Sequence, residues 1–133
     1  MKPSAGIRVF VDGNNVMGSR PDGWWRDRGA VARRLVAELE PLARRLGGKW
    51  MVVFDGCPPP GKAAGPATAV SVEYALHRGA DAADDHIFAL IAALPEQSDV
   101  LVYTSDRRLR ERVAALGVHV KGAGALWELA TTA

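Results

Sequence analysis

Short apolar runs recur along the chain and predict the strands of a sheet. Residues 7–11, 50–54 and 100–103 are almost entirely apolar and rich in β-branched or aromatic side chains, which is typical of strands buried on both faces. Residues 70–74 alternate apolar with polar side chains and predict a more exposed strand. Residues 118–120 predict a short last strand.

Apolar side chains with helical spacing fill most of the stretches between these runs. The predicted helices cover residues 27–46, 81–94 and 105–116, with a last helical turn at 125–130. Pro41 predicts a kink in the first helix or a join between two helices, and Ser105 is expected to open the third. Residues 13–26 and 57–66 are rich in Gly and Pro and predict loops, the former with one helical turn.

Strands that alternate with helices predict an α/β fold with a mainly parallel sheet. With 133 residues the chain has the usual size of one compact domain, so residues 1–133 are expected to form a single domain. No apolar run approaches the roughly 20 residues that a membrane helix needs, and no membrane partner is expected. The single cysteine, Cys57, excludes an internal disulfide and fits a reducing, cytoplasmic location.

The distribution of charge is more informative than the net charge of +2, which comes from 17 Lys and Arg against 15 Asp and Glu. Five aspartates are candidates for one acidic site: Asp12, Asp81, Asp84, Asp85 and Asp106. Without them the chain has ten acids and an excess of seven positive charges. A basic surface around an acidic centre suits a polyanion held by its phosphates, with metal ions at the centre. On charge alone, arginines that merely solvate helices explain the excess equally well.

Two of these aspartates follow predicted strands. Asp12 comes directly after the first strand, and Asp106 stands two positions beyond Thr104 at the end of the fourth. In open α/β sheets, ligands bind outside the carboxyl ends of the strands. We therefore expect both carboxylates to face a ligand there.

The start of the predicted helix 81–94 supplies the other three. At 100° per residue, Asp84 falls on the margin of the apolar face, Asp81 lies further round, and Asp85 lies furthest toward solvent. The helix dipole alone explains some acids at a helix start. Asp84, half turned to the core, is the least well explained as surface charge.

Carboxylates that cluster repel one another unless cations neutralise them. An oxygen-only ligand set selects Mg²⁺ or Mn²⁺, and the scattered His77, His86 and His119 offer no zinc site. One or two such ions promote the in-line hydrolysis of a phosphodiester. Asn15 is a candidate for positioning a phosphate or a water, and so are Thr104 and Ser105, although Ser105 is equally explained as a helix cap.

The four segments that hold these residues resemble the NYN domain of the PIN-like nucleases, with the bacterial YacP-like group as the most similar branch. They read Val-Asp12-Gly-Asn-Asn15-Val, Val-Val-Phe-Asp55-Gly, Gly-Ala-Asp81-Ala-Ala-Asp84-Asp85-His-Ile and Tyr-Thr-Ser105-Asp106-Arg. The resemblance covers residues 7–120, and its motifs stand in the family's order. The chain departs from the pattern in its Pro/Gly-rich segment 58–66 and its abrupt C-terminus.

The resemblance implies a three-layer, Rossmann-like (PIN-like) fold of about five strands in the order 3-2-1-4-5. It also implies endoribonuclease activity with Mg²⁺ or Mn²⁺ and ligation by Asp12, Asp84 and Asp106. Asp81 is an additional candidate ligand, because NYN relatives place an acid at either of two nearby helix positions. Asp55 is expected only to border the site.

The expected partner is RNA, presented either alone or by a larger RNA-containing assembly. Aromatic rings stack on unpaired bases and arginines clamp phosphates. The candidate contacts are basic or aromatic residues expected at the same sheet edge: Arg20, Trp24, Trp25, Arg26, Arg28, Lys62, Arg107 and Arg108. Packing over the helix that follows explains the Trp pair equally well. A domain of this size with four tryptophans is also a candidate homodimer.

Three alternatives to this enzyme remain open. A PIN-like domain can bind RNA or a protein without cutting, and PIN-like folds also serve as toxin ribonucleases. A haloacid-dehalogenase-type phosphatase also begins with a strand and an aspartate. That chemistry requires a second acid two residues later, where this chain has Asn14.

Overall fold

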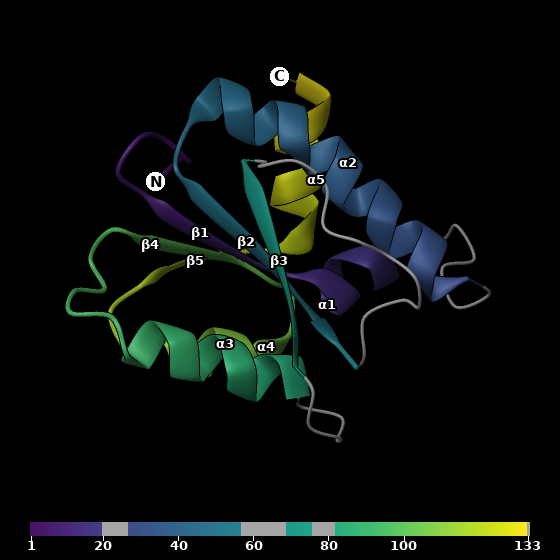
Figure 1. Cartoon of the computed structure of the whole chain (residues 1–133). Helices are drawn as coiled ribbons and strands as arrows, with labels where there is room; N and C mark the ends of the chain where they lie inside the picture. The colour runs from purple at the N-terminus through teal and green to yellow at the C-terminus, as the bar shows by residue number, and fades with distance from the viewer. Residues whose placement is uncertain (20–26, 57–68, 76–81, 133) are drawn as a thin grey trace.

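A computed structural model describes residues 1–19, 27–56, 69–75 and 82–132 of the chain. Within these ranges, five parallel strands form one sheet in the order β3-β2-β1-β4-β5 (Figure 1). The strands are β1 (Arg8–Asp12), β2 (Lys49–Asp55), β3 (Val70–Ala75), β4 (Val100–Tyr103) and β5 (His119–Lys121). The predicted α/β class, the parallel sheet and the order 3-2-1-4-5 are confirmed.

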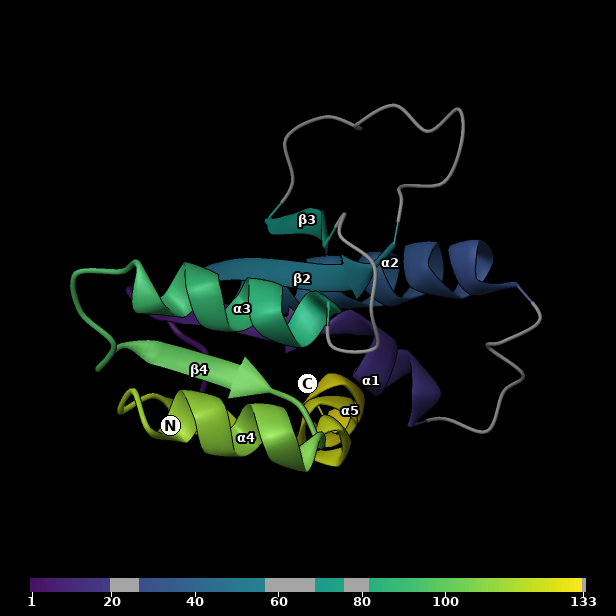
Figure 2. The same ribbon diagram turned by 90° about the horizontal axis from the view of Figure 1, so that it is seen from below.

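Helices cover both faces of the sheet and make three layers. They are α1 (Gly13–Gly18), α2 (Arg28–Leu46), α3 (Ala82–Ala92), α4 (Arg107–Ala114) and α5 (Ala123–Thr132). In Figure 1, α1, α2 and α5 lie above the sheet, and α3 and α4 lie below it. Figure 2 looks onto the second face, where α3 and α4 run beside each other.

The alternation of side chains along the strands divides the apolar core in two. Val9 and Val11 of β1 pack with α1, α2 and α5, whereas Phe10 between them packs with α3 and α4. The same division holds along β2 and β4. The central strands are therefore apolar on both faces, as their sequences predicted, and only their ends are available for polar side chains.

Several predicted elements differ from the structure; the last helical turn expected at 125–130, for example, is the ten-residue helix α5. Residues 13–18 form the helix α1, which is longer than the single turn expected. Residues 28–46 form one helix that contains Pro41, so a join between two helices is wrong. Pro41 is exposed, and so is Ala37 one turn earlier, whose carbonyl loses its helical partner to the proline ring. Water is available to that carbonyl, which makes the proline tolerable.

A further difference concerns the start of α4. Asp106, not Ser105, caps this helix: its Oδ1 accepts a hydrogen bond from the backbone N–H of Leu109 at 3.0 Å. The Oγ of Ser105 instead accepts from the backbone N–H of Ala123 at 2.9 Å, at the start of α5.

Within the described ranges, no helix is long and apolar enough to cross a membrane.

Candidate active site at the carboxyl edge of the sheet

Alternation along three neighbouring strands brings polar side chains to one corner of the sheet. Asp12 continues the face of Phe10 at the end of β1, and Asp55 continues the face of Val53 at the end of β2. Thr104, directly after β4, continues the face of Val102. Because the strands are parallel, these three residues lie at the same edge, on the face that α3 and α4 cover.

A single hydroxyl connects the two aspartates that follow β1 and β4. Thr104 is fully buried, and its Oγ1 donates a hydrogen bond to Oδ2 of Asp12 at 2.8 Å. The same Oγ1 accepts from the backbone N–H of Asp106 at 3.1 Å. Nη1 of Arg110 donates to the carbonyl oxygen of Thr104 at 3.0 Å. The structure therefore brings Asp12 and Asp106 together, as their positions after strands predicted.

The surroundings of Asp12 oppose its negative charge. The residue is 7% exposed, and burial is the main reason why its pKa rises from 3.8 to about 6. The nearby carboxylates of Asp106 and Asp55 raise this pKa further, while the hydrogen bond from Thr104 lowers it. A carboxylate buried beside other carboxylates is favourable only if a cation or a proton compensates it.

The first turn of α1 ties the neighbouring segments to this corner. Oδ1 of Asn14 accepts from the backbone N–H of Asp55 at 2.7 Å, and Oδ1 of Asn15 accepts from the backbone N–H of Ser105 at 2.8 Å. Gly13 permits this approach, because a Cβ there would lie 2.5 Å from the ring of Phe54. The expected role of Asn15 toward a phosphate stays a prediction; in the described part of the chain its amide oxygen holds the β4–α4 connection.

Asp55 extends this set of contacts to α3. Its Oδ1 accepts a hydrogen bond from the backbone N–H of Ala83 at 2.7 Å, in the first turn of that helix. The carboxylate therefore fixes the turn that carries Asp84, and its charge acts on Asp12 at the same time. Asp55 borders the site, as expected, and also helps to build it.

Asp84 is buried, as the helical periodicity predicted, but it is paired with arginines of α4. The residue is 8% exposed, and its Oδ2 accepts a hydrogen bond from Nη1 of Arg112 at 3.1 Å. Nε of Arg108 lies 3.9 Å from the same oxygen. The exposed Asp85 receives a second bond from Arg112 at 2.7 Å, and this bond is the main reason why the pKa of Arg112 rises.

The donors at this corner fit a hard divalent cation. They are carboxylate and hydroxyl oxygens, and the repulsion at Asp12 is what such a cation would remove. Within the described ranges, no three His, Cys, Asp or Glu side chains gather as a preformed metal centre. Asp81, the additional candidate ligand, lies outside those ranges.

Most of the predicted RNA contacts cannot be placed. Arg20, Trp24, Trp25, Arg26 and Lys62 lie outside the described residues, and the side chain of Arg28 is not described. Arg107 and Arg108 are exposed at the start of α4, next to Asp106. These two are therefore at the expected edge of the sheet.

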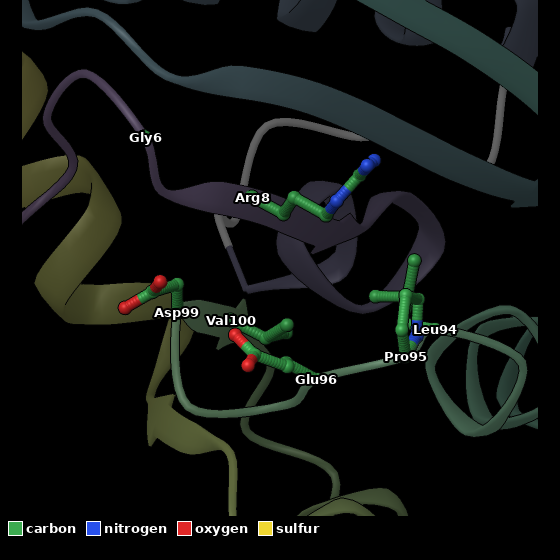
Figure 3. Close-up of a pocket in the computed structure, with 7 residues that line it drawn as sticks. All are labelled: Gly6, Arg8, Leu94, Pro95, Glu96, Asp99 and Val100. Atoms are coloured by element: carbon green, nitrogen blue, oxygen red, sulfur yellow. The ribbon is translucent and has the colours of Figure 1, made fainter.

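A pocket of about 330 Å³ lies at the opposite edge (Figure 3). It is lined by residues at the amino ends of β1 and β4, among them Arg8, Asp99 and Val100. It is open, and its charged lining combines one arginine with two acids, Glu96 and Asp99. Ligands of parallel α/β sheets bind at the carboxyl edge, so we place the candidate site at Asp12 and not here.

The sequence alone did not reveal the roles of three residues in this region. Asn14 and Asp55 hold the site together through backbone hydrogen bonds, and Arg112 holds Asp84. The Phe-Asp-Gly motif after β2 was a signal for Asp55, because it stands where Asp12 stands on the next strand. Arg112 follows Arg108 by one helical turn, which indicated a shared basic face but not its partner.

Comparisons with known proteins agree with this architecture. The sequence model of the YacP-like NYN domain family matches residues 9–133 of the chain. A crystal structure of a mutant of Rae1 (YacP) from Bacillus subtilis superposes with a TM-score of 0.75 at 22% identity, covering 95% of this chain and 76% of that one. Another crystal structure of Rae1 (YacP) from Bacillus subtilis gives 0.76 at 22% identity, covering 93% and 73%. At this identity the structural likeness concerns the fold. No curated protein matches the chain.

Proposed function

The chain belongs to the family of YacP-like NYN domains, and from that premise we propose that it is a metal-dependent endoribonuclease. NYN domains are generally nucleases, so the family supports a nuclease-type, RNA-related function. The finer proposal is hydrolysis of RNA phosphodiester bonds at Asp12, Asp84 and Asp106, with Mg²⁺ or Mn²⁺ as cofactor and Asp81 as an additional ligand.

The observation that carries this proposal is the unfavourable position of Asp12. Its carboxylate is buried, is hydrogen-bonded by Thr104, and lies near the charges of Asp106 and Asp55. Perturbed carboxylates of this kind are common at catalytic sites. A divalent ion held there would supply positive charge at the scissile phosphate and a more acidic water.

The chain's own residues orient this site. Thr104 fixes one oxygen of Asp12 and the backbone of Asp106, and Asn15 fixes the β4–α4 connection, which ends at Asp106. Arg107 and Arg108 are exposed beside Asp106, which supports a role for them in binding the phosphates that flank the cleaved bond. In this proposal the hydrogen bonds fix the positions of Asp12 and Asp106, while the two arginines bind the RNA backbone.

One observation favours a second candidate, a catalytically silent RNA-binding module. Asp84 is paired with Arg112, and Asp106 caps α4, so both acids stabilise the fold. A domain that keeps such aspartates for stability alone would show the same contacts. The nuclease remains the better-supported function, because stability does not explain the buried, like-charged surroundings of Asp12.

RNA cleavage by purified protein tests the proposal. Labelled single-stranded and structured RNAs are incubated with Mg²⁺, Mn²⁺ or EDTA, using the wild type, Asp12→Asn and Asp106→Asn. Asparagine is an equally good helix cap, so Asp106→Asn keeps α4 intact. Asp27→Asn, which changes the cap of α2 in the same way, is the matched control.

We expect cleavage that EDTA and both site variants abolish and that Asp27→Asn retains. Cleavage that is indifferent to EDTA or to both site variants would overturn the metal–carboxylate mechanism. Salt-sensitive RNA binding without cleavage of any RNA would favour the silent module.

A further inference from the structure

Arg112 joins α4 to the first turn of α3. Its Nη1 lies 3.1 Å from Oδ2 of Asp84 and 2.7 Å from Oδ1 of Asp85. Its guanidinium carbon lies 4.4 Å from the centre of the Phe88 ring, one helical turn beyond Asp84. Two ionic contacts and one cation–π contact therefore hold this side chain in one position.

The pairing of Arg112 with Asp84 is more enclosed than an ordinary surface ion pair. The side chains are 28% and 10% exposed, respectively, against 51% for Asp85. A carboxylate this buried is costly without a nearby positive charge. Arg112 supplies that charge from within the chain, and Arg108 adds a more distant one at 3.9 Å.

This arrangement bears on the proposed metal site, and the following inference rests on the proposed function. If Asp84 is a metal ligand, its carboxylate serves two cations, the guanidinium and the divalent ion. Positive charges a few ångströms apart in a partly buried site repel strongly. The arginine must therefore lower the affinity of Asp84 for the ion.

We propose that Arg112 is a positioning residue that acts through Asp84 as a built-in competitor of the divalent ion. In the metal-free protein it holds the Asp84 carboxylate against α4. Binding of Mg²⁺ or Mn²⁺ loosens the contact between Arg112 and Asp84, and the remaining contacts with Asp85 and Phe88 keep the arginine nearby. The affinity for the ion is thus set by an arginine that is not itself a ligand.

Calorimetric titration with Mn²⁺ tests this inference without an activity assay. Arg112→Gln should bind Mn²⁺ at least about tenfold more tightly than the wild type, the size expected from removing one nearby positive charge even when water screens it fully. Arg45→Gln is the matched control: it removes one charge from an exposed position of α2, in the opposite layer. It should bind Mn²⁺ as the wild type does.

A double-mutant cycle locates the effect at Asp84. In an Asp84→Asn background, Arg112→Gln should leave the Mn²⁺ affinity unchanged, because the shared carboxylate is gone. If the wild type binds Mn²⁺ through Asp12 and Asp84 but Arg112→Gln binds it equally or more weakly, the inference is overturned and the proposed function still stands. Wild-type protein that binds no Mn²⁺ would overturn the proposed function and the inference with it.

A measurement on the unmodified protein keeps the test independent of how Arg112→Gln folds. The Nε–H resonance of Arg112, identified by its absence from the spectrum of Arg112→Lys, is followed by NMR during titration with Mg²⁺. It should move with the same dissociation constant as the metal-site resonances. A resonance that does not move at saturating Mg²⁺ would contradict the competition.

Discussion

Asp12 and Asp84 are two aspartates of nearly equal burial with opposite surroundings. They are 7% and 8% exposed; Asp12 is the last residue of β1, and Asp84 lies in the first turn of α3. Asp12 has a hydroxyl group and the like charges of Asp106 and Asp55 around it. Asp84 has the guanidinium groups of Arg112 and Arg108.

The difference shows that burial alone does not identify a functional acid. The charge of Asp84 is compensated within the fold, where it links α3 to α4. The charge of Asp12 is disfavoured by burial and by the carboxylates of Asp106 and Asp55, so the folded protein carries a cost that a bound cation would remove. If Asp12 serves chemistry and Asp84 also serves stability, substitutions at the two positions should have different effects.

The largest expected effect is on catalysis at Asp12. Asp12→Asn should lower RNA cleavage by at least about 100-fold, more than the loss usual for a residue that only supports a metal ligand. Thermal stability in EDTA should not fall, because the amide keeps an oxygen for the Thr104 hydroxyl and removes a disfavoured charge. Melting curves and initial cleavage rates check both parts. Lower stability together with full activity would reverse the contrast between the two aspartates.

The pH dependence of stability should report the same residue. The pKa of Asp12 is about 6 when folded and 3.8 as the model value, so between these values the folded state binds the proton more tightly than the unfolded state. This contribution is fully present below about pH 4 and is lost as the pH rises through 6. Relative to the wild type, Asp12→Asn should gain up to about 3 kcal/mol between pH 4 and pH 7.

Urea unfolding in EDTA, at several pH values, measures this gain. The comparison of the two proteins cancels the titration of all groups they share. A difference that does not change with pH would show that the burial of Asp12 has no energetic consequence.

A third, smaller effect is expected from the hydroxyl that joins Asp12 to Asp106. Thr104→Val keeps the side-chain shape but leaves the Asp12 carboxylate and the Asp106 N–H without this partner, at a cost of about 1–3 kcal/mol. It should also raise the pKa of Asp12 further, because the lost bond favours the charged form. Thr104→Ser keeps the hydroxyl and should restore the pH profile of stability; a profile equal to that of Thr104→Val would contradict the role of this bond.

Much of this arrangement followed from the sequence, because it depends on local periodicity. Strand ends placed Asp12 and Asp106 at the carboxyl edge, and the helical period placed Asp84 against the core and Asp85 toward solvent. Alternation also separates the two faces of β1, which is enough to put Asp12 on the same face as Phe10. These signals extend over a few residues and need no knowledge of how the elements pack.

The residues that the sequence did not reveal act over long separations. Arg112 and Asp84 are 28 positions apart, and Asn14 is 41 positions from Asp55. Their pairing depends on how α4 packs beside α3 and how closely α1 approaches β2. The helix cap illustrates the same limit at short range: Ser105 and Asp106 are both good caps, and the bond from Ala123 decides between them.

The smallest expected effect separates the two aspartates that share Arg112. Asp85→Asn should change the free energy of unfolding by less than about 0.5 kcal/mol, because its side chain is half exposed and water competes for the contact. Asp84→Asn should cost more, about 1–3 kcal/mol, because it leaves the guanidinium facing a weaker partner in an enclosed position. Urea midpoints in EDTA at low and high salt give both values, and only the Asp85 value should shrink with salt. If both variants lose the same free energy of unfolding and salt reduces both losses equally, the contact of Arg112 with Asp84 is an ordinary surface ion pair. Asp84 would then not differ from Asp85 as a buried acid whose charge is compensated.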